Sequence, residues 1–306
     1  MGAIWLAAVA LSFTGWLAQT VNLQPATAEP TAAATAKPTG PLDWVCPMDR
    51  DVRSDQPGVC PRCGMTLVLG IPDEAEYPMT LSFSPKLIRA GQKERLLFQI
   101  HDPKTGKQVD RFQVVHEKLF HMFMVSQDLS YFLHDHPVEE PGGAFHFDAV
   151  FPKPGMYRVV ADVYPEGGTP QLIARTVIVP ETDRSLPPLA PAKLAPSLGP
   201  QHAANIDVEL TTEPSKPIAG MKTLLFFKIK PAEGLEKYLG AWGHMLAASD
   251  DLVDMIHTHP FLTYGGDQIQ FNLIFPRART YRIWVQFQRK GVVNTVEFTV
   301  PVADLD

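Results

Sequence analysis

Short hydrophobic runs recur along most of the chain and are the first guide to its structure. Runs such as "MTLSF", "RLLFQI", "YRVVADVY" and "LIARTVIV" are rich in β-branched and aromatic residues and are bounded by Gly, Pro and Asp. This pattern is typical of strands separated by turns, and the sequence shows neither helical periodicity nor a sustained heptad pattern. We therefore predict a mostly β fold.

The runs are organised as an internal repeat. "HMFMVSQDLSYFLHDHP" at 121–137 aligns with "HMLAASDDLVDMIHTHP" at 244–260, and the flanking segments align as well. Residues 78–180 and 204–302 are thus two copies of one unit. Several short strands in each copy predict two immunoglobulin-like antiparallel β-sandwich repeats, with an up-and-down barrel as the alternative.

The segments outside the repeats indicate an exported protein. An apolar stretch opens the chain, and "ATA" at 26–28 fits a signal-peptidase site. Residues 1–28 are therefore predicted to be a signal peptide or an N-terminal membrane anchor, in the periplasm or at the inner membrane. Proline-rich segments at 29–41 and 181–203 are predicted to be linkers. With a formal net charge of −6 and no long basic run, nucleic acid is not an expected partner.

The cysteines of the chain are clustered near its N-terminal end. Cys60 and Cys63 form a C-x2-C knuckle, in which two thiolates converge on one metal ion. Cys46 and Asp49 repeat the same spacing upstream, as a second knuckle. Residues 42–72 are therefore predicted to form a small zinc-ribbon-like metal-binding module, with these four side chains as candidate ligands.

Other interpretations of the cysteines are weaker. A thioredoxin-like redox pair needs a helix after the knuckle, but "GMTLVLGIPDE" reads as a short strand and a turn. A c-type haem site would need His in place of Gly64. A disulfide between two of the three cysteines stays open in an exported protein. Met48 and Met65 adjoin the knuckles, and their soft thioethers add candidate ligands for Cu(I).

The same stretch resembles the heavy-metal-binding domain of bacterial copper and silver efflux proteins. That domain reads aromatic-x-Cys-Pro-Met-His, then Ser-Asp-x-Pro-Gly-x-Cys-Pro-x-Cys-Gly-Met-x-Leu. This chain departs from it at Asp49, which replaces the family's His with a harder ligand. The resemblance implies a metal ion as ligand and a metal efflux system or membrane-bound metal transporter as partner. The matching residues are Trp44, Cys46, Pro47, Met48, Ser54, Asp55, Pro57, Gly58, Cys60, Pro61, Cys63, Gly64, Met65 and Leu67.

Three histidines occupy equivalent positions in each repeat. In the first repeat we predict a hairpin centred on Gln127 and Asp128, in which His121 lies opposite His134 and His136 is the diagonal neighbour. Residues i and i+2 of a strand share a face, and directly opposed Cβ atoms lie about 5 Å apart. The three imidazoles should therefore converge on one ion.

The second repeat carries the same pattern. With a hairpin centre between Asp250 and Asp251, His244 faces His257, and His259 is the diagonal neighbour. Packed histidines at the edge of a core are the alternative for a single residue. Three converging imidazoles favour a metal ion, because crowded lone pairs repel one another unless a cation binds them.

Repeat one has additional candidate histidines. His146, in "AFHFD", adds a possible fourth histidine to repeat one, where repeat two has Gln270. His116 is expected on the other face or in a loop. The segment "HEKLFH" lacks the H-E-x-x-H spacing of a zinc protease. Among the remaining methionines, Met255 alone shares the parity of a triplet histidine.

Together these features predict an exported protein that binds copper, or another soft heavy metal with zinc as the alternative, for sequestration or hand-over in metal resistance. No nucleophile–base pair or phosphate loop indicates an enzyme. Metal affinity at the histidines should fall as the pH drops through about 6.5. The alternative function is a structural zinc clip on a β-sandwich adhesion or assembly protein.

Overall fold

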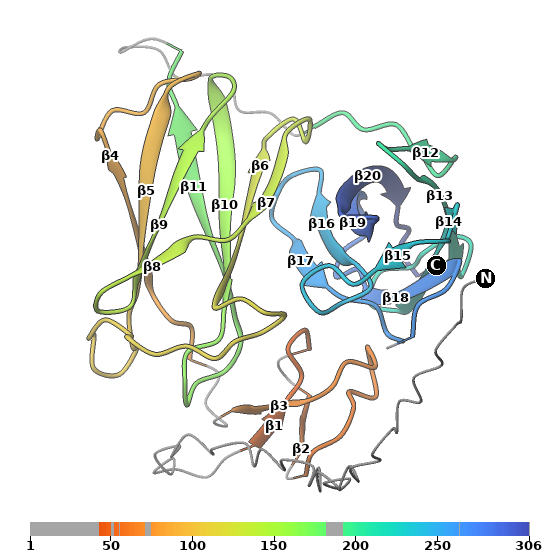
Figure 1. Ribbon diagram of the computed structural model, residues 1–306, viewed down its shortest axis with the longest axis horizontal. Coiled ribbons are helices and arrows are strands. Elements are labelled where there is room, and N and C mark those ends of the chain that lie inside the picture. Colours follow the sequence, from red (N-terminus) through yellow and green to blue (C-terminus); the bar gives the residue numbers. More distant parts are fainter. Residues whose placement is uncertain are drawn as a thin grey trace, which may run out of the picture. The chain divides into compact units, whose positions relative to one another are not determined.

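The computed structural model of this chain describes residues 43–49, 52–54, 56–70, 75–181, 192–262 and 264–305 (Figure 1). Every regular element among them is a strand, which confirms the predicted mostly β fold. None of their segments forms a helix long and apolar enough to cross a membrane. The predicted leader at 1–28 and the predicted linker at 29–41 lie outside the described residues.

The first repeat is a sandwich of two antiparallel sheets. Its strands are β4 (Met79–Ser84), β5 (Lys93–Ile100), β6 (Phe120–Ser126), β7 (Phe132–Asp135), β8 (Val138–Glu140), β9 (Ala144–Val150), β10 (Gly155–Val163) and β11 (Gln171–Val179). One sheet has the order β4-β5-β9-β8, and the other has the order β11-β10-β6-β7 (Figure 1). The chain crosses between the sheets after β5, after β7 and after β9, as in immunoglobulin-like sandwiches.

The second repeat has the same arrangement. Its strands are β12 (Gln201–His202), β13 (Asp207–Glu213), β14 (Lys222–Lys230), β15 (Leu235–Glu236), β16 (His244–Ser249), β17 (Met255–Thr258), β18 (Gln268–Ile274), β19 (Thr280–Arg289) and β20 (Val292–Pro301). One sheet is β12-β13-β14-β18, and in the other β19 pairs with β15, β16 and β20 while β17 pairs with β16. The internal repeat predicted from the sequence is therefore a structural repeat.

The proline-rich segment between the repeats is partly bonded to repeat two. Residues 182–191 lie outside the described part of the chain. Further along, Ala192 N donates to Asp250 O at 3.0 Å, and Ser197 exchanges two backbone hydrogen bonds with Thr299. The second half of the predicted linker thus follows the surface of repeat two.

Strand β6 is buried on both faces. Phe120, Met122 and Met124 pack into the core of repeat one. The alternate residues Phe123 and Val125 point away from that core, into a second cluster shared with repeat two. A strand in an isolated antiparallel sandwich would expose that face to water, so the burial of this face shows that the sheet is covered.

The equivalent sheet of repeat two packs on this face of β6. Leu246, Ala248 and Trp284 join Phe123 and Val125 in one apolar cluster. The ring of Phe132 stacks on that of Trp284, with centroids 4.9 Å apart and planes inclined by 10°. The two repeats therefore pack through their histidine-bearing sheets.

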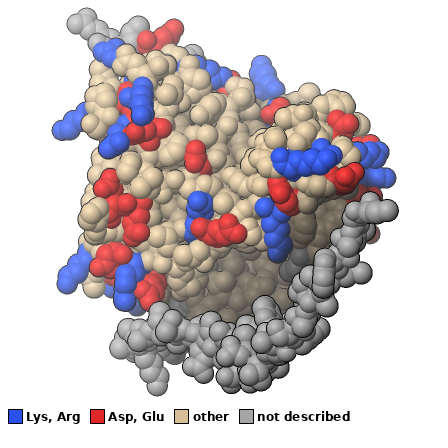
Figure 2. Space-filling view, in the orientation of Figure 1, with Lys and Arg blue, Asp and Glu red and all other residues tan. Residues whose placement is uncertain are grey.

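The surface carries charges of both signs. On the face drawn in Figure 2, Lys and Arg side chains lie interspersed with Asp and Glu side chains. Several form ion pairs, such as Arg95 with Asp148 and Arg111 with Glu166. This face offers no continuous basic surface to a polyanion.

The hairpin of repeat one differs from its predicted register by two residues. Phe123 pairs with His134, which places His121 opposite His136 rather than opposite His134. The turn is longer than predicted, because Ser126 N bonds to Tyr131 O and residues 127–130 form the loop. A shift of two residues keeps every side chain on its predicted face.

The hairpin of repeat two shows the same difference. Leu246 pairs with His257, so His244 lies opposite His259 and not opposite His257. The loop is again longer, since Ser249 N donates to Asp254 O at 3.0 Å. The prediction of convergence did not depend on this register, because both alternatives place the three rings on one face.

The cysteine module is a small three-stranded sheet. Its strands β1 (Asp43–Val45), β2 (Arg53–Ser54) and β3 (Val68–Gly70) pair in the order β2-β1-β3. Its buried core consists of the three cysteines and Leu67, with a few half-buried side chains around them. A core this small stabilises a fold weakly unless a metal ion or a neighbouring domain contributes.

Candidate metal centres

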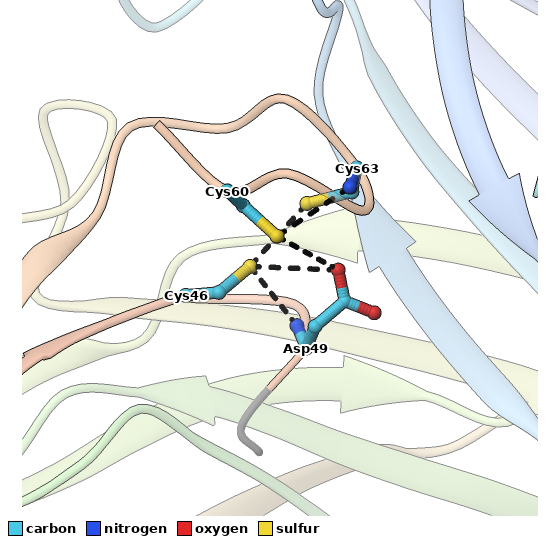
Figure 3. A group of neighbouring side chains, drawn as sticks. All are labelled: Cys46, Asp49, Cys60 and Cys63. Atoms are coloured by element: carbon cyan, nitrogen blue, oxygen red, sulfur yellow. Dashed lines mark hydrogen bonds between the residues drawn. The ribbon is translucent and has the colours of Figure 1, made fainter. Parts of the chain in front are cut away.

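Four side chains of the module converge on one point (Figure 3). Cys46 Sγ lies 3.3 Å from Cys63 Sγ, and Asp49 Oδ2 lies 3.2 Å from Cys60 Sγ. The cysteines are free thiols, since a disulfide would bring two sulfurs to about 2.05 Å. One donor atom from each residue lies within 4.8 Å of the others. Three thiolates and a carboxylate at this spacing can surround one tetrahedral ion.

Both knuckles direct backbone amides at sulfur atoms. Asp49 N lies 3.1 Å from Cys46 Sγ, and Cys63 N lies 3.4 Å from Cys60 Sγ. The turn after the second knuckle is closed by Gly64, whose φ of 81° suits glycine. These amides stabilise the thiolate form that a metal ion requires.

The thiols differ in acidity without a metal ion. The hydrogen bond from Cys63 lowers the pKa of the Cys46 thiol to about 7, and the amides of Asp49 and Met48 add to this effect. The same hydrogen bond raises the pKa of Cys63, and burial raises the pKa of Cys60. One thiolate is thus available near neutral pH, and binding of an ion releases the protons of the other two.

The module is seated on repeat two beside the histidine hairpin. Asn272 Nδ2 donates to the Cys63 carbonyl at 2.8 Å, and Thr258 Oγ1 lies 3.8 Å from Met65 Sδ. Gly64 touches the ring of Phe261, and a Cβ atom at this position would lie 1.5 Å from the ring carbon Cε2. No residue other than glycine fits at this contact.

The two methionines of the module pack against the cysteine core, and each also lines a cavity. Met65 lines a cavity of about 230 Å³ together with His116, His257 and His259. Met48 lines a second cavity of about 300 Å³, which it shares with Met255 and His257. Soft sulfur atoms therefore lie between the cysteine cluster and the histidines of repeat two.

The histidine triplet of repeat one converges as the sequence predicts. His121 Nδ1 lies 3.2 Å from His134 Nε2 and 3.2 Å from His136 Nε2. Two nitrogens bound to one ion at 2.0–2.1 Å with tetrahedral angles would be about 3.3 Å apart. The spacing of the three ring nitrogens therefore fits a shared metal ion.

The triplet of repeat two has the same geometry. His244 Nδ1 lies 3.0 Å from His259 Nε2, and the donor atoms of His244, His257 and His259 lie within 4.8 Å of one another. His244 Nε2 lies 2.9 Å from Tyr238 O, just as His121 Nε2 lies 2.9 Å from Val115 O. In both repeats a backbone carbonyl fixes the tautomer and leaves Nδ1 facing its triplet.

Burial keeps five of the triplet histidines neutral. It lowers the pKa of His121 to about 4 and that of His136 to about 3, with repulsion from neighbouring histidines adding to the effect. The pKa values of His134, His244 and His259 lie well below the usual range for the same reason. Neutral imidazole is the form that binds metals, so burial moves the competition from protons at these five residues below the predicted pH of about 6.5.

Three further residues lie near the triplets, and the sequence analysis did not identify Asp162 or Gln286 among them. His116 lies in a loop at φ 47°, and its ring stacks on that of His259 at 3.6 Å. Asp162 Oδ2 lies 2.6 Å from His257 Nδ1, and Gln286 Oε1 lies 2.6 Å from His134 Nδ1. Each of these contacts joins one repeat to the other, which no pattern within a single repeat could reveal.

His146 is not brought to the triplet of repeat one. It lies on β9, in the other sheet of the sandwich, where it pairs with Val138 and Leu97 in register. Its Nδ1 lies 2.6 Å from Glu140 Oε1, at the sandwich edge. The prediction of His146 as a ligand fails because β9 belongs to the sheet opposite the hairpin.

Comparison with known proteins separates the module from the repeats. Residues 44–68 match the heavy metal binding domain, which confirms the predicted resemblance. Residues 73–181 and 201–304 match a family described as a domain of unknown function, DUF8832. No curated protein matches the sequence significantly.

Solved structures with similar folds come from several sources. The Yersinia pseudotuberculosis adhesin InvE is 12% identical with a TM-score of 0.22, over 74% of this chain and 60% of that one. The Escherichia coli adhesin FdeC is 13% identical with a TM-score of 0.26, over 78% and 68%. Chicken CNTN1 FN1-FN3 domains are 9% identical with a TM-score of 0.20, over 77% and 71%. At TM-scores this low, the similarities indicate nothing about function.

The family matches agree with the boundaries in the structure. The two segments that match the second family coincide with the two sandwiches, and they cover more than half of the chain. The heavy-metal match coincides with the module that gathers the cysteines. The chain belongs to the family described as Domain of unknown function (DUF8832), with a heavy metal binding domain ahead of its two repeats.

Proposed function

We propose that this chain is an exported binding protein, not an enzyme, that sequesters copper or a related soft metal ion, or hands it over to a metal efflux system. The observation that carries the proposal is the convergence of Cys46, Asp49, Cys60 and Cys63 within a heavy metal binding domain. Thiolates select thiophilic ions such as Cu(I) and Zn²⁺. Thioethers of Met48 and Met65 beside the site add a preference for Cu(I).

The place of the module favours hand-over within the molecule. The Met65 side chain lines the same cavity as His116, His257 and His259. The Met65 thioether and these imidazoles thus lie beside the cysteine module as a set of further ligands for an ion that leaves the thiolates. Ligands of graded softness at neighbouring positions support a molecule that receives an ion at one site and stores it at another.

The proposal is tested by metal content. The purified protein would be kept reduced and anaerobic, incubated with Cu(I) or Zn²⁺, and analysed for bound metal. We expect more than one copper ion per chain, with one lost in the Cys46→Ser/Cys60→Ser/Cys63→Ser variant and the excess lost when His134, His136, His257 and His259 are replaced by Ala. The exposed His202 gives the control, since H202A should leave the content unchanged. Copper content unaffected by all of these variants would contradict the proposal.

A structural zinc clip is the second candidate, and the seating of the module favours it. Asn272 fixes the Cys63 carbonyl, and Gly64 is wedged against Phe261, so the knuckle is held rigidly on repeat two. A structural ion would be a single zinc that stays bound through purification and stabilises the fold. One zinc per chain, unchanged by the histidine variants, would favour this candidate over metal hand-over.

Export is tested separately from metal binding. When the full chain is expressed in a bacterium, cell fractionation and the mass of the mature protein report its location and its N-terminus. Cleavage after Ala28 gives a periplasmic protein, and an intact N-terminus in the membrane fraction gives an anchored one. Recovery of the intact chain from the cytoplasm would contradict export.

A further inference from the structure

The two histidine triplets lie together at the interface between the repeats. The ring centroids of His121 and His244 are 5.8 Å apart, and those of His121 and His257 are 5.5 Å apart. The rings of His134 and His244 are also 5.5 Å apart. The rings of His121, His134, His244 and His257 are therefore nearly as close to the other repeat's triplet as to their own.

The hydrogen bonds behind the rings leave lone pairs facing one another. The Val115 carbonyl can only accept, so His121 carries its proton on Nε2 and its lone pair on Nδ1. Gln286 Nε2 donates to Thr295 Oγ1, which turns its Oε1 toward His134 and places the proton of that ring on Nδ1. Two lone pairs 3.2 Å apart, His121 Nδ1 and His134 Nε2, repel unless a cation lies between them.

The second triplet holds an unpaired nitrogen of the same kind. The carboxylate of Asp162 accepts from His257 Nδ1, so in the neutral ring Nε2 bears the lone pair. This Nε2 is buried and lacks a hydrogen-bond partner among the described residues. A buried acceptor without a partner is unfavourable, and a bound cation would satisfy it.

The supporting acceptors are exchanged between the repeats. Asp162 of repeat one holds His257 of repeat two, and Gln286 of repeat two holds His134 of repeat one. The two acceptors occupy equivalent positions, since Asp162 pairs with His121 on β10 and Gln286 pairs with His244 on β19. Neither triplet has its full set of supporting hydrogen bonds within one repeat.

We infer that the two triplets form a single two-ion centre for imidazole-binding transition metals of the zinc and copper class, assembled only where the two repeats meet. This inference rests on the proposed function only in that the triplets bind metal. The crossed acceptors orient the ligands, as partners behind metal-bound imidazoles do. The two positions are unequal, because a carboxylate supports the ion of repeat two and a neutral amide supports the ion of repeat one. Divalent ions therefore bind more tightly at His244, His257 and His259.

The experiment measures Zn²⁺ affinity at one triplet at a time, in full-length protein with the three cysteines changed to Ser. With His134 and His136 changed to Ala, the triplet of repeat two remains. D162N, a change in repeat one, should then weaken zinc binding about 10- to 100-fold. Q286A should leave it unchanged within about twofold.

The reciprocal parent, with His257 and His259 changed to Ala, keeps the triplet of repeat one. Q286A should now weaken zinc binding, and D162N should leave it unchanged. Q286E should tighten it about tenfold, a gain that a misfolded variant could not give. The control D207N removes a carboxylate 2.6 Å from the exposed His202 and should change neither parent.

The outcomes separate the two proposals. Two results would overturn the two-ion centre with crossed support. In the first, each single-triplet protein binds zinc, but its zinc affinity changes only with substitutions in the same repeat. In the second, its zinc affinity changes equally with D162N and Q286A. Parents that bind no zinc would remove the histidines from the proposed function and the inference with them, while the cysteine site would still stand. Thermal unfolding of the metal-free variants identifies any loss of fold.

Discussion

Single hydrogen bonds decide which ring nitrogens in this protein are open to a metal ion. The carbonyls of Val115 and Tyr238 hold the Nε2 protons of His121 and His244, so both rings turn Nδ1 toward their triplets. Sequence reasoning identified these histidines because they recur at equivalent positions in two repeats. It could not identify Asp162 and Gln286, because a lone acid or amide on a strand has many possible partners.

The neutral state of the buried histidines predicts how the metal-free protein responds to acid. In the folded protein, burial holds the pKa of His121 and His116 at about 4, whereas an unfolded chain takes up these protons near pH 6.5. The unfolded state therefore binds more protons between about pH 6.5 and about pH 4, so the free energy of unfolding falls as the pH falls through this window. Each deeply buried histidine contributes up to about 1.4 kcal/mol per pH unit.

Urea unfolding of the metal-free protein between about pH 7 and about pH 5 measures this slope. H134N should reduce the slope, since burial also lowers the pKa of His134. The same change at the exposed His202 should not reduce it. A free energy of unfolding that stays level below pH 6.5 would contradict the neutral, buried state of these histidines.

Asp49 predicts an altered metal preference for the cysteine site. Its Oδ2 lies among the sulfurs and its Oδ1 lies 3.4 Å from Arg62 Nη1, so the carboxylate is both a candidate ligand and one side of an ion pair. D49H supplies the softer ligand found in related modules, and it should raise the preference for Cu(I) over Zn²⁺ about tenfold or more. Competition with chromophoric chelators measures both affinities. D148N, on the surface of repeat one, is the control, and an unchanged ratio in D49H would exclude Asp49 from the site.

At the scale of elements, the sequence predicted which strands exist and which faces the histidines share, but not how the hairpins turn. The predicted turn centre at 127–128 assumed a tight loop. The structure instead places Leu129 at φ 57° and Leu252 at φ 55°, a conformation that a leucine adopts only when its surroundings require it. Both side chains are buried between the repeats, and this contact lies outside the local sequence.

Leu129 therefore fixes the longer hairpin through tertiary packing. L129A should lower the free energy of unfolding by about 2–5 kcal/mol, because the side chain is fully buried. L129G removes slightly more of the side chain than L129A does. Glycine adopts the left-handed backbone conformation without strain, so L129G should be no less stable than L129A and up to about 1 kcal/mol more stable. Urea unfolding of both variants, beside L87A at an exposed position, measures the difference. A clearly less stable L129G would contradict the role given to the backbone.

At the scale of the whole molecule, the association of the repeats is the feature that the sequence analysis did not predict. The signal was present in "HMFMVS", which reads as apolar on both faces where an exposed sheet would alternate. Such a run indicates that another part of the protein packs on the sheet, but it does not identify that part. The internal repeat could have suggested the answer, since two copies of one apolar face can pack on each other.

The contact between the repeats should also determine how tightly the histidine centre binds metal. Trp284 is 3% exposed and stacks on Phe132 across the interface. W284A should lower the free energy of unfolding by about 3–5 kcal/mol. It should also weaken Zn²⁺ binding at both triplets, because the crossed acceptors Asp162 and Gln286 reach their histidines only while the repeats stay together.

Calorimetric titration with Zn²⁺ and thermal unfolding test this prediction, with Y264A at an exposed position as the control. Metal binding at the cysteines should survive W284A. The module is seated by a hydrogen bond from the Asn272 side chain, which lies on β18, and Trp284 lies on β19 in the opposite sheet of repeat two. Weakened triplets beside an intact cysteine site would place the cause in the interface. Undiminished zinc affinity at the triplets in a W284A protein whose stability has fallen would mean that each repeat holds its own ion, and that the packing of the repeats serves stability alone.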